Sequence, residues 1–226
     1  PEANRSSNMP PNEANPNEGR SVAPGEWLRL GLVHVSVPLT LLLCGGDAGW
    51  WQAWTFSLLI VAAGVGGRAW AEWRHPGLMA ERERTRSLKT SDIKSWDKIL
   101  GPLMALTLSF PPAIVAGLDQ RFAWSPVFPI WLNAAGILLI AAGFAFASWA
   151  LAENRFFSTL MRIQTDRGHT VCDTGPYRIV RHPGYAGNVL AAPGIVLALG
   201  SLWTLVPVGI ALVVAMIRTS LEDRTL

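Results

Sequence analysis

Long apolar runs alternate with short polar stretches along the first two thirds of the chain. Each run is close to the roughly 20 residues that an α-helix needs to cross the hydrocarbon core of a bilayer. The runs are Trp27–Gly46, Trp50–Trp73, Ile99–Leu118 and Val127–Ala152. Because hydrocarbon offers the backbone no hydrogen-bond partners, such segments must be helical. The pattern predicts four transmembrane helices.

A second apolar region follows near the C-terminus and is divided by Gly200-Ser201. Its pieces, Asn188–Leu199 and Leu202–Ile217, have twelve and sixteen residues, and the first is short for a full crossing at about 1.5 Å per residue. We therefore predict a tilted helical hairpin that returns Arg218–Leu226 to the side where the hairpin begins. The predicted fold is an all-α polytopic membrane protein with four transmembrane helices and a C-terminal helical hairpin.

Composition supports this fold class. Of the 226 residues, 50% are hydrophobic, 15% are charged and eleven are Trp, which is too apolar for an ordinary soluble domain. A soluble bundle would need polar faces on most helices, and these runs show almost none. The net charge is only +3, without a basic cluster interleaved with aromatics, so we predict no nucleic-acid partner. The two cysteines, Cys44 and Cys172, suggest neither a disulfide framework nor a metal site.

The chain divides into three regions by pattern. Residues 1–25 are rich in Pro, Asn, Ser and Glu and are predicted to be a disordered tail, with no signal-peptide pattern. Residues 26–152 hold the four transmembrane helices and a basic amphipathic linker at 75–98, which we expect to lie on headgroups. Residues 153–226 form the predicted catalytic region. The first residue is Pro, as expected of a processed, engineered or partial chain.

Lys and Arg are distributed unequally between the loops on the two sides. Six lie in His75–Lys98 and five in Glu153–Gly184, whereas the two opposite loops share one, Arg121. Basic loops of membrane proteins are mostly cytoplasmic. We therefore predict an integral membrane protein, of the inner membrane if bacterial, with cytoplasmic termini and a cytoplasmic polar stretch at Gly175–Gly187.

That stretch, Gly175–Gly187, holds turn formers, two arginines, one His and two Tyr between apolar segments. Its Gly-Pro and Pro-Gly pairs predict backbone turns at both ends, and hence a shaped loop. Arginines and backbone N–H groups can bind an anionic ligand, and the Tyr rings offer faces for a cation or a flat ring. The alternative is a basic juxtamembrane loop that contacts lipid headgroups.

The order of short motifs resembles the isoprenylcysteine carboxyl methyltransferases and their phospholipid-methylating relatives. The motifs are His169-Thr170-Val171-Cys172, Gly175-Pro176-Tyr177, Arg181-His182-Pro183-x-Tyr185-x-Gly187 and Glu222-Asp223. They cover roughly Asn154–Leu226. The resemblance implies an integral membrane methyltransferase that uses S-adenosylmethionine and acts on a lipophilic or small acceptor, with membrane lipids as its surroundings.

The resemblance also implies roles for individual residues. His182 would donate to a carboxylate or ribose oxygen, Tyr185 would pack on the cofactor, and Gly187 would allow close approach. Arg181 would pair with the cofactor carboxylate. The remaining predicted cofactor contacts are His169, Val171, Gly175, Tyr177 and Glu222. His169 is also the candidate base for an amine or hydroxyl acceptor.

The acidic pair is expected to complete the site. Glu222 matches the family's first acid and would accept from the cofactor ammonium, while Asp223 replaces the second acid with a shorter one. Arg218 lies four residues before Glu222, on the same helical face, so the two can pair and act as the catalytic residues. A surface ion pair without function is the alternative.

Two other classes of function are compatible with parts of the pattern. Sterol-type membrane reductases carry a related Arg-His-x-x-Tyr signature and bind a nicotinamide cofactor, and a membrane scaffold would need no cofactor. The Gly-Pro-Tyr lead-in and Pro183 favour the methyltransferase. Family members usually continue after the acidic pair with a polar segment that carries a Tyr and an Arg, so we expect either a longer chain or a more open site.

Overall fold

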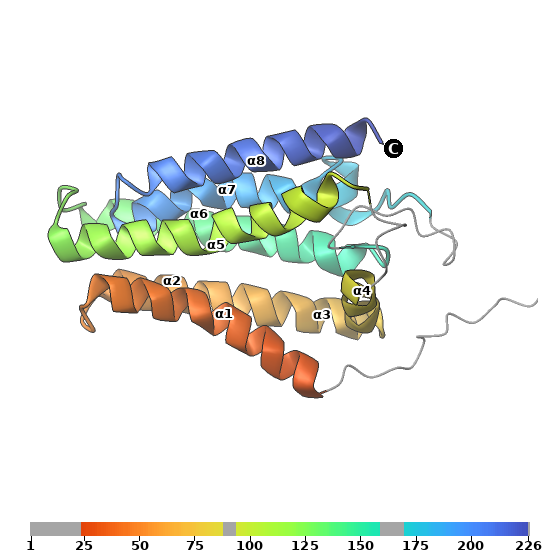
Figure 1. Cartoon of the computed structure of the whole chain (residues 1–226), viewed down its shortest axis with the longest axis horizontal. Coiled ribbons are helices and arrows are strands. Elements are labelled where there is room, and N and C mark those ends of the chain that lie inside the picture. The colour runs from red at the N-terminus through yellow and green to blue at the C-terminus, as the bar shows by residue number, and fades with distance from the viewer. Residues whose placement is uncertain (1–23, 88–93, 159–169, 226) are drawn as a thin grey trace, which may run out of the picture.

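The computed structural model describes residues 24–87, 94–158 and 170–225, and every regular element in these residues is helical (Figure 1). This confirms the predicted all-α class. The predicted disordered tail lies almost wholly outside the described residues, because the first described residue is Pro24 at the start of helix α1.

The helices form one elongated bundle in which the long helices run roughly along the same axis (Figure 1). In chain order they are α1 (Pro24–Gly45), α2 (Trp51–Val61), the π-helical turn η1 (Ala62–Gly66), α3 (Gly67–Arg74), α4 (Leu78–Ser87), α5 (Asp97–Phe122), α6 (Ile130–Glu153), the 3₁₀ turn η3 (Gly175–Arg178), α7 (Pro183–Leu199) and α8 (Leu205–Asp223).

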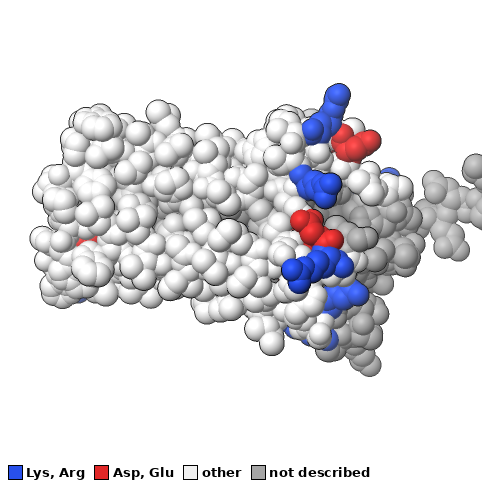
Figure 2. Space-filling model, turned by 90° about the horizontal axis from the view of Figure 1, so that it is seen from above, with Lys and Arg blue, Asp and Glu red and all other residues white. Residues whose placement is uncertain are grey.

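Four of these helices are long and apolar enough to cross a membrane. They are Trp27–Gly45, Asp97–Phe122, Ile130–Glu153 and Leu205–Asp223. Figure 2 shows Lys, Arg, Asp and Glu gathered towards one end of the face it presents, while the rest of that face is almost free of charge. A long uncharged surface with charge at its end is the pattern of a membrane-embedded bundle.

The second predicted transmembrane helix differs from its prediction. The helical path continues from α2 to α3 but contains the π turn η1 at Ala62–Gly66. The sequence here is rich in glycine, and a Cβ placed on Gly64 would collide with the ring of His34 on α1. The π turn therefore coincides with a close contact between α1 and this helix.

Three further boundaries correct the sequence prediction. Helix α6 begins at Ile130 rather than Val127, because Pro129 disfavours helical geometry in the residue before it. Helix α7 begins at Pro183, so the polar loop ends at His182; Pro suits the first position of a helix. Helix α8 has 19 residues and includes Glu222, so it extends beyond the predicted end at Ile217.

The Pro111-Pro112 pair does not interrupt α5, which is helical from Asp97 to Phe122.

The start of the predicted headgroup linker, as far as the structure describes it, is packed on the bundle. Leu78 and Glu81 at the start of α4 are buried, and the Arg82 guanidinium lies 5.2 Å from the centre of the Phe157 ring. Helix α4 therefore packs against the end of the bundle, and contact of the linker with headgroups stays a prediction.

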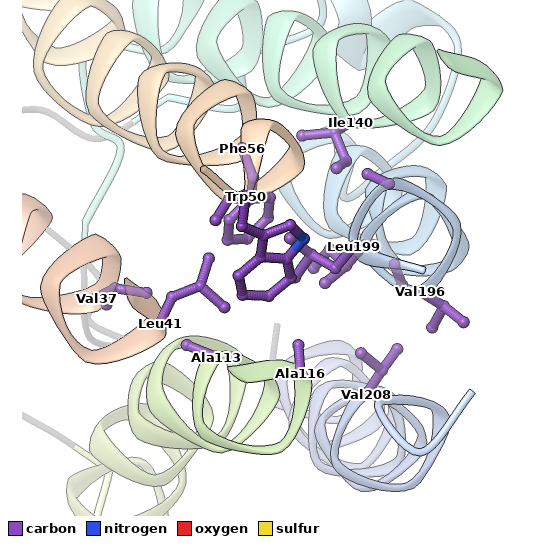
Figure 3. Close-up of a cluster of buried hydrophobic side chains, with 14 residues drawn as sticks. Val37, Leu41, Trp50, Phe56, Ala113, Ala116, Ile140, Val196, Leu199 and Val208 are labelled. Atoms are coloured by element: carbon purple, nitrogen blue, oxygen red, sulfur yellow. The ribbon is translucent and has the colours of Figure 1, made fainter. Parts of the chain in front are cut away.

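The hydrophobic core joins both halves of the chain (Figure 3). Trp50, which is 2% exposed, packs with Leu41 of α1, Ala116 of α5, Ile140 of α6 and Leu199 of α7. Contact between elements so far apart in sequence means that the N-terminal helices and the C-terminal hairpin form one packed unit.

Helices α6 and α7 approach most closely, through glycines spaced seven residues apart on each helix. A Cβ on Gly187 would lie 2.5 Å from the carbonyl oxygen of Gly143, and one on Gly194 would lie 2.7 Å from that of Gly136. Small residues permit such backbone approach between membrane helices. The N-terminal turn of α7, which carries the polar motif, is thereby fixed against α6.

A polar cluster at the opposite end of the bundle holds the turn of the C-terminal hairpin. The Asp119 carboxylate accepts from the hydroxyls of Ser125 and Ser201, at 2.6 and 2.5 Å. Gly200 takes the left-handed conformation (φ 67°) that ends α7. The cluster attaches the hairpin turn to the end of α5, and so sets the position at which α8 returns to the polar motif.

Candidate active site

The polar motif begins with a tight turn packed under the end of α6. Gly175 has φ +54°, a conformation that favours glycine, and Pro176 is buried. The Tyr177 hydroxyl donates to the carbonyl of Ala150 at 3.3 Å, and burial raises the pKa of Tyr177 to about 12. Tyr177 therefore stays a neutral phenol at physiological pH.

Glu153, the last residue of α6, connects this turn to α3. Its carboxylate accepts from the hydroxyl of Thr174 at 2.7 Å and lies 3.4 Å from the Arg74 guanidinium. The ends of three segments are thus joined at the same end of the bundle.

Arg218 lies near the C-terminal end of α8 and is buried, with 6% of its surface exposed. Its Nε donates to Oδ1 of Asp97 at 2.6 Å, and its Nη2 donates to Oδ2 at 3.0 Å. Asp97, in the first turn of α5, is fully buried. A bidentate pair of this kind fixes the guanidinium plane, and a carboxylate at a helix N-terminus is favoured by the helix dipole.

The rest of the guanidinium faces Tyr185 and Glu222. Arg218 Nη1 donates to the Tyr185 hydroxyl at 2.6 Å, and that hydroxyl donates to Oε1 of Glu222 at 3.0 Å. Arg218 Nη2 also lies 3.4 Å from the same Glu222 oxygen. The Glu222 carboxylate is therefore oriented from one side by two groups that are themselves held in place.

His182, which precedes the first residue of α7, contacts both acids of the tail. Its Nε2 lies 2.8 Å from Oδ1 of Asp223, and its Nδ1 lies 3.7 Å from Oε2 of Glu222. The Asp223 side chain is 46% exposed, whereas that of Glu222 is 14% exposed. The two acids therefore differ sharply in their access to solvent.

These groups border a cavity of about 870 Å³ that extends between the helices. Its polar end carries Arg181, His182, Tyr185, Arg218 and Glu222. Its apolar walls come from α1, α5 and α6, and include Val37, Leu108 and Phe144. The volume lies in the range of small-molecule and cofactor sites, and the cavity joins a charged end to a hydrocarbon-like interior.

Comparison with known protein families identifies the C-terminal part of this arrangement. The model for the phospholipid methyltransferase family matches residues 131–226. This segment belongs to the phospholipid methyltransferase family. Comparisons with curated proteins and with solved structures gave no match. The match confirms the resemblance read from the motifs, and together with the apolar helices it supports a membrane methyltransferase.

The phospholipid methyltransferase segment brings most of the predicted site residues to the cavity. Those that line it are Val171, Tyr177, Arg181, His182, Tyr185, Arg218 and Glu222. Gly175 and Gly187 do not line it: Gly175 packs against the Glu153 side chain, and the close approach at Gly187 is to α6 rather than to a ligand. His169 lies outside the described residues.

Sequence reasoning missed Asp97, the main partner of Arg218. Asp97 lies outside the methyltransferase segment, beside Lys94 and Lys98, where an acid in a basic linker suggests a solvated surface. One feature of the sequence could have pointed to Asp97: it lies at the start of an apolar helix, where the helix dipole favours an acidic side chain. The distance of 121 residues between Asp97 and Arg218 left no local pattern that could pair them.

Proposed function

We propose that the protein transfers a methyl group from S-adenosylmethionine to a lipophilic or small acceptor at the cytoplasmic face of the membrane. The observation that carries this proposal is the Glu222 carboxylate, which Tyr185 and Arg218 orient at the polar end of a cavity whose other walls are apolar. The phospholipid methyltransferase family supports the reaction class.

The chemistry of the residues fits this cofactor. Its ammonium needs a carboxylate in a poorly hydrated place, which Glu222 provides. Its carboxylate needs donors, for which Arg181, His182 and the first N–H groups of α7 are suited. Its adenosine needs a flat, partly apolar surface, and Tyr177, Tyr185 and Val171 provide candidates. In this proposal Gly175 and Gly187 contribute by shaping the turn and by packing.

When bound, the cofactor would supply an electrophilic methyl group on sulfur. An acceptor lone pair would form the new bond to the methyl carbon as the carbon–sulfur bond breaks, and the sulfur would keep the electrons of the broken bond. Alignment and exclusion of water can supply most of the catalysis. A carboxylate or thiolate acceptor needs no general base, whereas an amine or hydroxyl acceptor does, and His169 is the proposed base. In this proposal Glu222 holds the cofactor ammonium, and Arg218 orients Glu222.

Removing His182 tests the cofactor assignment. The His182→Ala and Tyr185→Ala variants should each bind S-adenosylmethionine about tenfold more weakly, because each loses a hydrogen-bonding group beside Glu222. Calorimetric titration of the purified variants in one detergent measures this. His75→Ala is the matched control, because His75 lies near the Glu153 carbonyl, at 3.4 Å, and does not line the cavity. Wild-type affinity in both test variants would reject the assignment.

The cytoplasmic orientation rests on the eleven-to-one ratio of Lys and Arg between the two sets of loops. Single cysteines at Thr90 and Ala48, in a Cys44→Ser, Cys172→Ser background, report the two sides. An impermeant thiol reagent added to intact cells should modify Ala48→Cys but not Thr90→Cys. Modification of Thr90→Cys under those conditions would reverse the proposed orientation.

A further inference from the structure

A second polar group lines the cavity, away from the methyltransferase motifs. His34 of α1 and Arg68 of α3 both border the cavity, with His34 Nε2 3.1 Å from Arg68 Nη1. Both residues precede the segment that matches the phospholipid methyltransferase family, residues 131–226. The N-terminal helices therefore contribute polar chemistry of their own to the cavity.

The π turn η1 positions this pair. Arg68 Nη1 donates to the carbonyl of Gly64 at 2.7 Å, so the side chain folds back along its own helix. The ring of His34 packs directly on Gly64, where a Cβ would collide with it, and its Nδ1 lies 2.8 Å from the Leu30 carbonyl. Single π turns are frequent at functional sites, and this one aligns a guanidinium and an imidazole on one cavity wall.

The pair lies deeper in the bundle than the charged end. Arg68 precedes Arg74 by six residues, which is about 9 Å along a helix, and Arg74 pairs with Glu153 where α3 and α6 end. Arg68 lines the same cavity as apolar side chains such as Val37, Leu108 and Phe144. Ionisable groups inside a membrane bundle are costly and usually mark a ligand site or pathway.

We propose that Arg68, supported by His34, binds the anionic group of a lipid whose hydrocarbon chains lie along the apolar wall of the cavity. Guanidinium N–H groups suit phosphate or carboxylate oxygens, and His34 supports the guanidinium by accepting from Arg68 Nη1. Basic pockets between membrane helices bind acidic headgroups. The lipid would be the methyl acceptor, an identification that rests on the proposed function. The anionic subsite would then hold the acceptor while its reacting group faces Tyr185 and Glu222.

A purely structural role for Arg68 makes a different prediction. If Arg68 only ties α3 to the Gly64 carbonyl and to His34, its replacement would change stability without changing ligand preference. Binding measurements with matched ligands separate the two roles, and they need no methyl transfer.

The experiment titrates purified protein, in a neutral maltoside detergent, with dihexanoyl phosphatidic acid, with dihexanoylglycerol and with inorganic phosphate. Wild type should bind the phosphatidic acid at least tenfold more tightly than either comparator. Arg68→Gln should remove at least about 90% of that preference, and Arg68→Lys should retain part of it because the charge is kept. Arg29→Gln, an exposed arginine of α1 outside the cavity, should behave as wild type.

Two results would overturn the proposal. One is an unchanged preference for phosphatidic acid in Arg68→Gln; the other is equal affinity for inorganic phosphate and for the lipid, which would mean that the chains contribute nothing. Thermal unfolding of each variant identifies a folding defect. If Arg68→Gln is defective, the Arg68→Lys and His34→Gln variants replace it in the lipid-binding comparison. Lipid binding without S-adenosylmethionine binding would reject the proposed function and leave this site standing.

Discussion

Replacing Asp97 by Asn is expected to lower the free energy of unfolding by about 3 kcal/mol, since breaking a buried ion pair leaves the other charge poorly compensated. Asp97 is fully buried and holds Arg218 through two hydrogen bonds. For a chain of this length, the midpoint of thermal unfolding should fall by roughly 10 °C. Circular dichroism in a fixed detergent measures the change.

Asp223→Asn is the matched control for this prediction, because Asp223 is exposed and contacts only His182 among the hydrogen bonds described for it. Its midpoint should equal that of wild type within error. A midpoint for Asp97→Asn equal to that of the control would mean that the Asp97–Arg218 pair contributes no more than an exposed ion pair.

Replacing Glu222 by Gln is expected to weaken S-adenosylmethionine binding about thirtyfold. An ammonium that loses a carboxylate partner in a poorly hydrated site loses about 2 kcal/mol or more. Glu222 is the better placed of the two tail acids: it is largely buried, lines the cavity and is oriented by Tyr185 and Arg218. Gln is nearly isosteric, so the change removes charge with little change in packing.

Asp223→Asn again serves as the comparison, and it should weaken binding less than about threefold, because Asp223 does not line the cavity. Both affinities are measured by calorimetry at one salt concentration. Equal small losses in the two variants would mean that the α8 tail is a solvated surface helix, and the cofactor would then have to bind through the Gly175–His182 loop without it.

The meeting of the two polar motifs could be predicted from the sequence. An apolar region divided by Gly200-Ser201 had to form a hairpin, and a hairpin returns Glu222 to the side where His182 lies. The structure confirms this, with His182 Nδ1 3.7 Å from Glu222. The pairing of Arg218 with Glu222 was also predictable, because both lie on one helical face.

The partners that cross between distant helices could not be predicted in the same way. Asp97 and Arg218 are joined only because α5 and α8 pack side by side, and helix packing leaves no fixed spacing in the sequence. Gly187 shows the opposite difficulty. The sequence suggests that its missing side chain leaves space for a ligand, whereas residues of α6 occupy that space. A glycine requirement alone does not identify the group that approaches it.

The cavity could not be predicted from the sequence pattern either. Its walls combine α1, η1, α5 and α6 with the C-terminal motifs, and periodicity assigns each helix a buried face without saying where packing is incomplete. The π turn at Ala62–Gly66 had no signal other than its glycines, because the apolar run around it is continuous.

Calorimetric titration of the purified wild-type chain with S-adenosylmethionine and, separately, with NADPH tests the central claim most directly. The cavity with Glu222 at its polar end predicts saturable binding of one S-adenosylmethionine per chain and no measurable binding of NADPH. Binding of NADPH without S-adenosylmethionine would contradict the claim, and would instead favour the reductase class that shares the Arg-His-x-x-Tyr pattern.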